Sequence, residues 1–300
     1  MSIKSYLKNN KFVMKLYDKC LPYYCIYFTK PAVKMLYKQT FGKKLNLDNP
    51  KDLNEKINWL KVYRYKNDPL VIQCADKYRV RKYIEDCNCA EILNEIYGVF
   101  YDYKKVSLSE LPKQFVLKLN RGAGMNLICT DKSKLNEKDI KELLRKWFHS
   151  ECGERYGELH YRKTQPCVIC EKYLGNENGD YPTDYKVYTF GGKAHMVEIC
   201  VERREKVKFL YVDTSYKRID YGETNYDGNL PDKPDCFDKI IEYAEKLSKP
   251  FCHVRVDFYV YNGNPVFGEM TFTNNGGFDK VINQRGLQAM GDLLVLPDKK

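Results

Sequence analysis

The stretch FCHVRVDFYVYNGNPVFGEMTFTNNGG, from Phe251 to Gly277, decides how this chain folds. Its first half alternates apolar side chains with charged residues or tyrosine, which is the periodicity of a β-strand. Asn262-Gly263-Asn264-Pro265 has the composition of a tight turn, and Val266-Phe267 begins a return strand. The stretch is therefore predicted to be a β-hairpin.

The hairpin would gather one arginine and two carboxylates. Arg255, Asp257 and Glu269 are spaced so that they could share one face near its open end. Mg²⁺ takes carboxylate oxygens and keeps part of its coordination for phosphate and water, and arginine offers a planar fork to phosphate oxygens. The alternative is an ordinary hairpin whose polar residues face solvent, and this stretch alone leaves that alternative open.

Two segments upstream have features of a phosphate site. FVLKLN (115–120) is a strand with Lys118 near its end, and a lysine there is costly to bury unless it meets an anion. RGAGMN (121–126) follows as a loop in which Gly122 and Gly124 would let backbone amides approach phosphate. The pattern G-x-x-x-x-G-K-[ST] is absent, and a plain hairpin turn would also explain both glycines.

Two further strands carry charged residues. CVICEKYL (167–174) is a short apolar strand that ends at Glu171, and TDYKVYTF (183–190) contains Asp184 and Lys186. In chain order there is thus a lysine strand, a glycine loop, a glutamate strand, an Asp-x-Lys strand, an Arg-x-Asp strand and a closing glutamate strand. This order resembles the ATP-grasp fold. FVLKLN, the Asp-Lys-Tyr around position 77, HVRVDFY and FGEMTF are similar to its TupA-like branch, which is linked to teichuronopeptide and other surface polysaccharides.

The resemblance spans about positions 40 to 297 and implies an α+β ATP-grasp fold. In such a fold a small lid domain and a larger mixed-sheet domain clasp ATP, here with a helical N-terminal region. The expected division is a helical, amphipathic arm over 1–45, a helical region over 46–112, the lid over 113–175 and the catalytic subdomain over 176–300.

The resemblance also implies roles for particular residues. The expected ATP contacts are Lys77, Lys118, Gly122, Gly124, Glu171 and Lys186. Lys186 and Arg255 are expected to be catalytic, and Asp257, Glu269 and Thr271 to bind Mg²⁺. Many ATP-grasp enzymes have asparagine at the place of Thr271, but the TupA-like motif itself has threonine there. Asn274 or Asn275 remain alternatives for this third ligand.

The activity implied is ATP-dependent ligation of a carboxylate to an amine, through an acyl-phosphate, on a cell-surface or capsular polysaccharide or its precursor. An acidic sugar or glycan would supply the carboxylate, and an amine or amino acid the other partner. No Ser/His/Asp or Cys/His triad is recognisable, and this mechanism needs none. Two alternatives stay open: a kinase that phosphorylates a sugar hydroxyl, and a glycosyltransferase, although no Asp-x-Asp motif of the usual kind is present.

Composition limits the remaining classes. With 300 residues, 43% of them hydrophobic and 30% charged, the chain is globular and large enough for one or two domains. A net charge of +11 favours anionic partners such as nucleotides, acidic glycans or an anionic membrane surface. The 26 tyrosines are spread along the chain without an RNA-binding consensus, so nucleic acid is not expected.

The twelve cysteines are expected to be reduced thiols of a cytoplasmic protein, because no secretory signal is apparent. Cys167 and Cys170 form the only Cys-x-x-Cys spacing and are predicted to be small buried residues. His149, Cys152 and His160 are near one another in the sequence, but a structural zinc site usually has four ligands.

Helical patterns cover much of the first 111 residues. One helix is predicted to begin at Asn49, before Pro50, and a second to run from Pro69 through Arg81. In the first forty residues, aromatic and aliphatic side chains recur at helical spacing among lysines, without the roughly eighteen apolar residues of a membrane span. This arm either packs on the body or rests its basic, aromatic face on the inner surface of a membrane.

Overall fold

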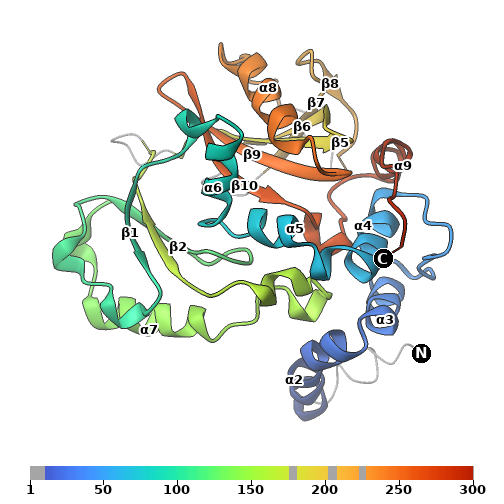
Figure 1. The fold of residues 1–300 in the computed structure, drawn as a ribbon, viewed down its shortest axis with the longest axis horizontal. Coiled ribbons are helices and arrows are strands. Elements are labelled where there is room, and N and C mark those ends of the chain that lie inside the picture. The colour runs from blue at the N-terminus through green and yellow to red at the C-terminus, as the bar shows by residue number, and fades with distance from the viewer. Residues whose placement is uncertain (1–10, 176–180, 202–207, 223–227, 300) are drawn as a thin grey trace.

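The computed structural model describes residues 11–175, 181–201, 208–222 and 228–299. Two sheets, each with helices packed against it, form its framework (Figure 1). In both sheets every pair of neighbouring strands is antiparallel. The expected α+β architecture is therefore present. The larger sheet, however, is not the mixed sheet we expected, because its strands are linked mainly by hairpins.

The smaller sheet has four strands in the order β1 (Ile96–Phe100), β4 (Val168–Glu171), β2 (Phe115–Leu119) and β3 (Asn126–Cys129). Helix α7 (Glu137–Phe148) packs on one face through Ile140, Leu144 and Trp147, and its Asn136 side chain caps it by accepting from the amides of Lys138 and Asp139. Figure 1 shows this unit to one side of the molecule. Strand β1 lies within 46–112, so that interval is not wholly helical.

The larger sheet has six strands in the order β10 (Asn264–Thr271), β9 (His253–Tyr261), β5 (Asp184–Phe190), β6 (Lys193–Val201), β7 (Lys208–Val212) and β8 (Arg218–Ile219). Helix α8 (Phe237–Ser248) covers it with the buried stripe Phe237, Ile240, Ala244 and Leu247. These side chains belong to the main hydrophobic core with the inward residues of β5, β6 and β9.

The β9–β10 hairpin forms as predicted. Its connection is Asn262 and Gly263, which have φ of 50° and 74°. Positive φ at both positions is the requirement of a type I′ turn, whose twist matches that of the two strands. Pro265 is tolerated because β10 is an edge strand and needs no ladder donor on its outer side.

Helix α4 (Leu53–Tyr63) begins later than predicted. The Asp52 side chain caps it by accepting from the Glu55 amide at 2.9 Å, and the Glu55 carboxylate accepts in turn from the Lys51 amide at 2.8 Å. This reciprocal cap starts the helix at Leu53, so the predicted start at Asn49 was wrong. The helix is anchored to α9 (Gln284–Leu293) by Lys56, whose Nζ donates to the Gly291 carbonyl at 2.7 Å.

The predicted second helix is in fact two helices, α5 (Pro69–Cys74) and α6 (Val80–Asp86). Between them the Asp76 carboxylate accepts from the amides of Tyr78 and Arg79 at 2.9 and 3.0 Å. An aspartate side chain that binds nearby amides in this way competes with helical hydrogen bonding. The resulting turn places Lys77 outside any helix.

The N-terminal arm consists of α2 (Lys11–Tyr27) and α3 (Thr29–Phe41). Leu21 and Cys25 of α2 and Ala32 and Leu36 of α3 form a small core that also touches Phe278. The arm therefore packs on the body, as one of the two alternatives predicted. No helix in the described part of the chain is both long and apolar enough to cross a lipid bilayer.

Candidate active site

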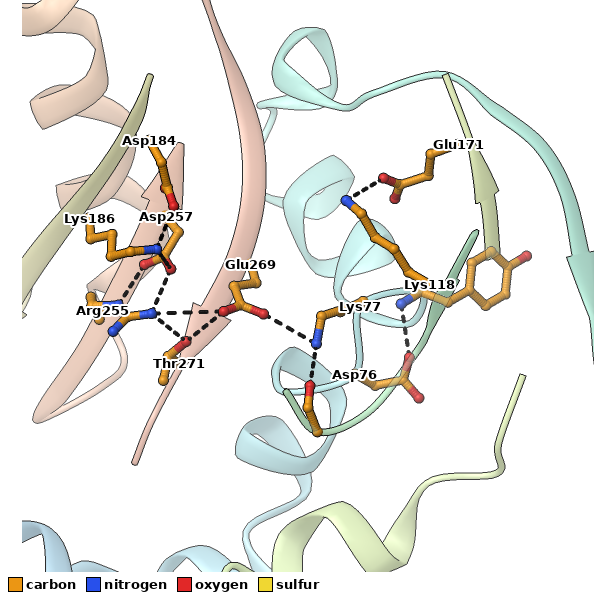
Figure 2. Close-up of polar contacts among 12 residues, drawn as sticks. Asp76, Lys77, Lys118, Glu171, Asp184, Lys186, Arg255, Asp257, Glu269 and Thr271 are labelled. Carbon is orange, nitrogen blue, oxygen red and sulfur yellow. Dashed lines mark hydrogen bonds and ion pairs between the residues drawn. The ribbon is translucent and has the colours of Figure 1, made fainter. Parts of the chain in front are cut away.

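The β9–β10 hairpin places four polar residues in two facing pairs. Asp257 of β9 lies opposite Glu269 of β10, and Arg255 lies opposite Thr271 (Figure 2). The register shifts at Gly268, which is an extra residue on β10. The hairpin therefore brings together the three residues that the sequence placed at its open end.

The Arg255 guanidinium donates to both carboxylate oxygens of Asp257. Nε donates to Oδ1 at 2.7 Å and Nη2 to Oδ2 at 2.6 Å, while Nη2 lies 3.8 Å from Glu269 Oε1. Burial alone would lower the pKa of Arg255, but the Asp257 carboxylate raises it well above the usual value. This is the bidentate geometry in which arginine binds carboxylates and phosphates most strongly.

Lys186 lies on β5, the strand next to β9, directly opposite Asp257. Its Nζ donates to Asp257 Oδ2 at 3.0 Å and to Asp184 Oδ2 at 2.6 Å. Burial would lower the pKa of Lys186, but the neighbouring Asp257 raises it well above its usual value. Lys186 therefore stays charged, because two carboxylates compensate it.

Lys77 reaches the hairpin from the turn between α5 and α6. Its Nζ donates to the Gly122 carbonyl at 2.7 Å and lies 3.2 Å from Glu269 Oε2. Burial would raise the pKa of Glu269, but Lys77, Arg255 and Lys186 together lower it to about 2. Glu269 is thus an ionised carboxylate that already has cationic neighbours.

Lys118 and Glu171 belong to the smaller sheet, on the neighbouring strands β2 and β4. Lys118 Nζ donates to Glu171 Oε2 at 2.7 Å and lies 5.9 Å from the centre of the Tyr259 ring on β9. Burial would lower the pKa of Lys118, but Glu171 raises it above its usual value. This ion pair faces the hairpin from the other sheet, as Figure 2 shows.

The glycine loop joins β2 to β3 beside these residues. Gly122 and Gly124 have φ of 72° and 76°, a conformation that residues with a Cβ adopt only with strain. A Cβ on Gly122 would also lie 3.3 Å from the Cβ of Cys152, whereas Gly124 faces open space. Both glycines are therefore required by the turn itself, and Gly124 leaves space for a ligand.

Two adjoining hollows lie between the sheets and share Lys118, Asn126 and Tyr259. The first has about 490 Å³ of empty space, and its lining includes the apolar Val116, Ile128, Leu174 and Pro182 beside the charged Lys118 and Glu171. The second has about 580 Å³, and its lining includes Lys77, Lys118, Lys186, Gly122, Gly124, Asp257 and Glu269. The first hollow is thus the more apolar of the two, and the second is lined by more charged side chains.

A third, larger hollow of about 1500 Å³ meets the second at Gly122, Ala123, Met125 and Glu269. Its walls include Arg255 and Thr271 of the hairpin, and Tyr156 and Phe278 from the side of the N-terminal arm. The facing pair Asp257 and Glu269 thus lies near the junction between a cation-lined hollow and a large open one.

The oxygen donors of Asp257, Glu269 and Thr271 are of the type that a hard divalent cation prefers. Thr271 Oγ1 lies 3.4 Å from Glu269 Oε1, so the two belong to one cluster. Both oxygens of Asp257 are engaged by Arg255 and Lys186, and a cation would have to share them. The alternative ligand Asn274 is buried, and its Oδ1 lies 3.1 Å from His253 Nε2. The described residues contain no group of three or more His, Cys, Asp or Glu suited to a metal.

The cysteines are all free thiols, and Cys167 and Cys170 are buried as predicted. Burial raises the pKa of each of these two thiols to about 12, so neither is a thiolate near neutral pH. Around the disfavoured zinc position, His149 is exposed, whereas Cys152 and His160 are buried.

The structure also brings residues to the site that sequence reasoning missed. The Asn120 side chain donates to Asp76 at 2.7 Å, and the Asn120 carbonyl accepts from the Lys77 amide at 2.7 Å. These bonds fix the Lys77 turn to the end of β2. On β6, Glu198 accepts from the Tyr188 hydroxyl at 2.9 Å behind Lys186. The Asp-Lys-Tyr motif was the available signal for Asp76, whereas nothing local marked Glu198.

Residues 55–295 match the family model for TupA-like ATP-grasp proteins, one branch of the ATP-grasp class. The chain therefore belongs to the TupA-like ATP-grasp family. No curated protein matches the chain.

Solved structures with a similar fold are ATP-grasp ligases of low sequence identity. D-alanine–D-alanine ligase from Bacillus anthracis, complexed with ATP, is 14% identical with a TM-score of 0.44, over 81% of this chain and 63% of that one. L-amino acid ligase from Bacillus licheniformis is 13% identical with a TM-score of 0.43, over 83% and 56%. The ligase PsnB, complexed with minimal precursor, Mg and ADP, is 12% identical with a TM-score of 0.40, over 95% and 73%. The chain thus spans less than two thirds of the length of the first two ligases.

Proposed function

We propose that this protein is an ATP-dependent ligase that joins a carboxylate to an amine through an acyl-phosphate. The observation that carries the proposal is the position of Asp257 and Glu269, opposite each other near the junction of the cation-lined hollow and the large hollow. A phosphoryl group bound there would have basic side chains on one side and space for an acceptor on the other.

The nucleotide would occupy the two adjoining hollows. Its base fits the apolar hollow of Val116, Ile128 and Leu174, and its phosphates fit the hollow of the lysines and the glycine loop. Backbone amides of a loop with positive φ at two glycines form a cradle for anions. Glu171 would reach the nucleotide at the boundary between base and phosphates.

The basic side chains of the site are held in position by carboxylates. Four basic side chains, Lys77, Lys118, Lys186 and Arg255, are paired with Glu171, Asp184, Asp257 and Glu269. Every cation is held near the phosphate hollow before any nucleotide binds. Phosphate oxygens can then replace carboxylates as partners of these cations with little rearrangement, so the site is preorganised.

Asp257, Glu269 and Thr271 would hold Mg²⁺ with the nucleotide. When bound, the ion supplies positive charge against the transferring phosphoryl group. The chain's own cations have complementary tasks: Lys118 and Lys77 bind phosphates, while Arg255 and Lys186 stabilise the charge that develops in the transition state.

The reaction would have two steps. A carboxylate oxygen of the acceptor in the large hollow attacks the terminal phosphorus of ATP, the bond to the bridging oxygen breaks, and ADP leaves. The amine then attacks the acyl carbon, the C–N bond forms, the bond from carbon to the phosphate oxygen breaks, and phosphate and one proton are released. The side chains bind and orient the reactants, and none acts as a nucleophile.

We propose that the four-stranded unit with α7 acts as the lid and the six-stranded unit as the catalytic body, following the division 113–175 and 176–300. Strand β1 would then belong to the lid as well, because it pairs with β4. The substrate we propose is a cell-surface or capsular polysaccharide or its precursor, with an acidic sugar as carboxylate. Family membership and the net charge of +11 support this choice.

The test is a product assay with purified protein, ATP and Mg²⁺, in which candidate acidic glycans and amines are supplied singly and together. A ligase releases ADP and free phosphate in equal amounts only when both partners are present, and it forms an amide visible by mass spectrometry. Transfer of phosphate to a sugar hydroxyl without an amine would replace this proposal by the kinase alternative. Release of a nucleoside diphosphate from a nucleotide sugar would replace it by the glycosyltransferase.

A further inference from the structure

Helix α2 carries a stripe of large apolar side chains on its outer face. Leu16, Tyr23 and Tyr27 are 51%, 60% and 75% exposed, and Cys20 between them is also exposed. Spacings of four, three and four residues place these side chains on one side of the helix. A different stripe, with Leu21 and Cys25, packs on α3. The helix thus has a second apolar face that remains open to solvent.

Both helices of the arm carry exposed lysines. Lys15 and Lys19 are exposed on α2, and α3 has exposed lysines four residues apart at Lys30, Lys34 and Lys38. Asp18 is the only acidic residue in the segment 11–41, and it is already 3.6 Å from Arg155 Nη1. The exposed positive charge therefore lacks compensation by acidic residues of the arm.

We propose that α2 and α3 form a docking surface for an anionic lipid membrane. Leucine and tyrosine side chains suit the interfacial layer of a bilayer, and exposed lysines on the same two helices attract the phosphates of anionic lipids. A second copy of the arm fits less well, since it would bring two sets of lysines together. Each helix is too short and polar to span the bilayer, so the arm would lie on the surface.

The arm is fixed to the body beside the large hollow. Pro22 lacks an amide hydrogen, so the Asp18 carbonyl one turn earlier has no helical donor. Arg155 belongs to the short 3₁₀ helix η6 (Glu154–Tyr156) and donates to that carbonyl from Nη2 at 3.2 Å. Cys25 Sγ donates in turn to the Arg155 carbonyl at 3.4 Å.

Tyr156, the residue after Arg155, lines the large hollow. Docking would therefore hold the hollow close to the membrane, where a lipid-linked acceptor is accessible; this last step rests on the proposed function.

Vesicle flotation of the full chain, without nucleotide or substrate, tests the docking itself. We expect the protein to float with vesicles of phosphatidylcholine mixed with an equal amount of phosphatidylglycerol, and not with phosphatidylcholine alone. Binding should weaken as salt is added, because exposed charges are screened. Equal binding to both kinds of vesicle, or binding to neither, would overturn the proposal.

Two sets of variants separate the apolar and the basic contributions. Leu16→Ser with Tyr23→Ser and Tyr27→Ser should weaken binding roughly tenfold or more. Lys15→Gln with Lys19→Gln and Lys34→Gln should weaken it by roughly fivefold per lysine. The matched control is Lys134→Gln with Lys138→Gln and Lys146→Gln, all exposed in the lid, which removes the same charge and should leave binding near parental.

Circular dichroism would confirm that each variant keeps the parental melting temperature. If the control weakened binding as much as the arm variant, net charge rather than this surface would be responsible. If the parent were instead a dimer by sedimentation and the serine variant a monomer, the stripe would be a contact between copies. The first result would refute docking through this surface, and the second would refute membrane docking. A failure of the ligase assay would not affect this test, because the test requires no catalysis.

Discussion

Glu269 lies opposite Asp257 because Gly268 is an extra residue in β10. On the turn side, Phe267 pairs with Phe258, and after the shift Glu269 pairs with Asp257. If the two strands paired without this bulge, Gly268 would lie opposite Asp257, and Glu269 would lie opposite the next residue of β9. In a strand, a shift of one residue turns a side chain to the other face. The bulge is therefore what joins the two carboxylates into one site.

Gly268→Ala should disturb this pairing. An added Cβ would lie 3.0 Å from the Asp257 carbonyl oxygen and 3.3 Å from the Tyr259 ring, so these neighbours must give way by a few tenths of an ångström. We expect a loss of about 1–3 kcal/mol in unfolding free energy, as for other overpacked sites, and a larger fall in turnover. The matched control is Gly263→Ala in the turn, where φ is 74° and no atom lies within 4 Å. It should cost about 1–2 kcal/mol in stability from backbone strain but spare turnover. Equal losses of turnover in both variants would contradict the role of the bulge.

Glu269→Gln keeps the size of the side chain but removes its charge. If Glu269 and Asp257 act together on the transferring phosphoryl group, turnover should fall by roughly 10²–10³ while the affinity for ATP changes little. Asp257→Asn should behave in the same way. The double variant should lose much less than the product of the two single effects, because both residues would act through one ion. Steady-state phosphate release and ATP titration separate these quantities. Near-parental turnover in both single variants would exclude the site from this hairpin.

Lys118→Ala tests the phosphate hollow. Removal of Lys118 deletes one cation and leaves Glu171 without its partner at 2.7 Å. A charged hydrogen bond is worth about 1.5–3 kcal/mol, so ATP affinity should fall by roughly 10- to 100-fold, as measured by calorimetry. Lys193→Ala is the control, because that lysine is exposed and pairs with Glu245 at the far end of β6. If Lys118→Ala bound ATP as tightly as the parent, the lysine would have no role in nucleotide binding.

The hairpin was predictable because its signals are local. Asn262-Gly263 specifies its turn through backbone conformation, and alternating side chains specify the two strands. The proximity of Arg255, Asp257 and Glu269 followed from that hairpin. The match of residues 55–295 to the family model confirms the resemblance that the order of motifs had suggested.

The remainder depends on contacts between distant segments. Lys77 lies outside the predicted helix for two reasons. The Asp76 carboxylate accepts from two backbone amides, and the carbonyl of Asn120, which is far away in sequence, accepts from the Lys77 amide. Glu198 reaches the site only through the register of β5 and β6. The early start predicted for α4 failed because Asp52 and Glu55 form a reciprocal cap three residues further on. In each case the deciding contact or register is one that local sequence patterns do not specify.

The contribution of Glu269 to stability should depend on pH with a definite sign. Its folded pKa is about 2, below the ordinary value of 4.5, so the folded state binds fewer protons than the unfolded state between these values. The stabilisation is then fully present above about pH 4.5 and is lost as the pH falls toward 2. The shift alone implies about 3 kcal/mol. Because 34% of the side chain is exposed, we expect roughly 1–2 kcal/mol.

Urea unfolding of the parent and Glu269→Gln, from about pH 6 to about pH 3, would measure this term. The advantage of the parent over the variant should shrink as the pH falls. Glu198→Gln is a control of opposite sign, because burial raises the pKa of Glu198 and its ionised form costs stability. The stability of the parent relative to Glu198→Gln should rise as the pH falls. Glu269→Gln could instead follow the trend of Glu198→Gln. In that case Lys77 and Arg255 would not compensate the burial of Glu269, and the proposal that the charges of the site are preorganised would be wrong.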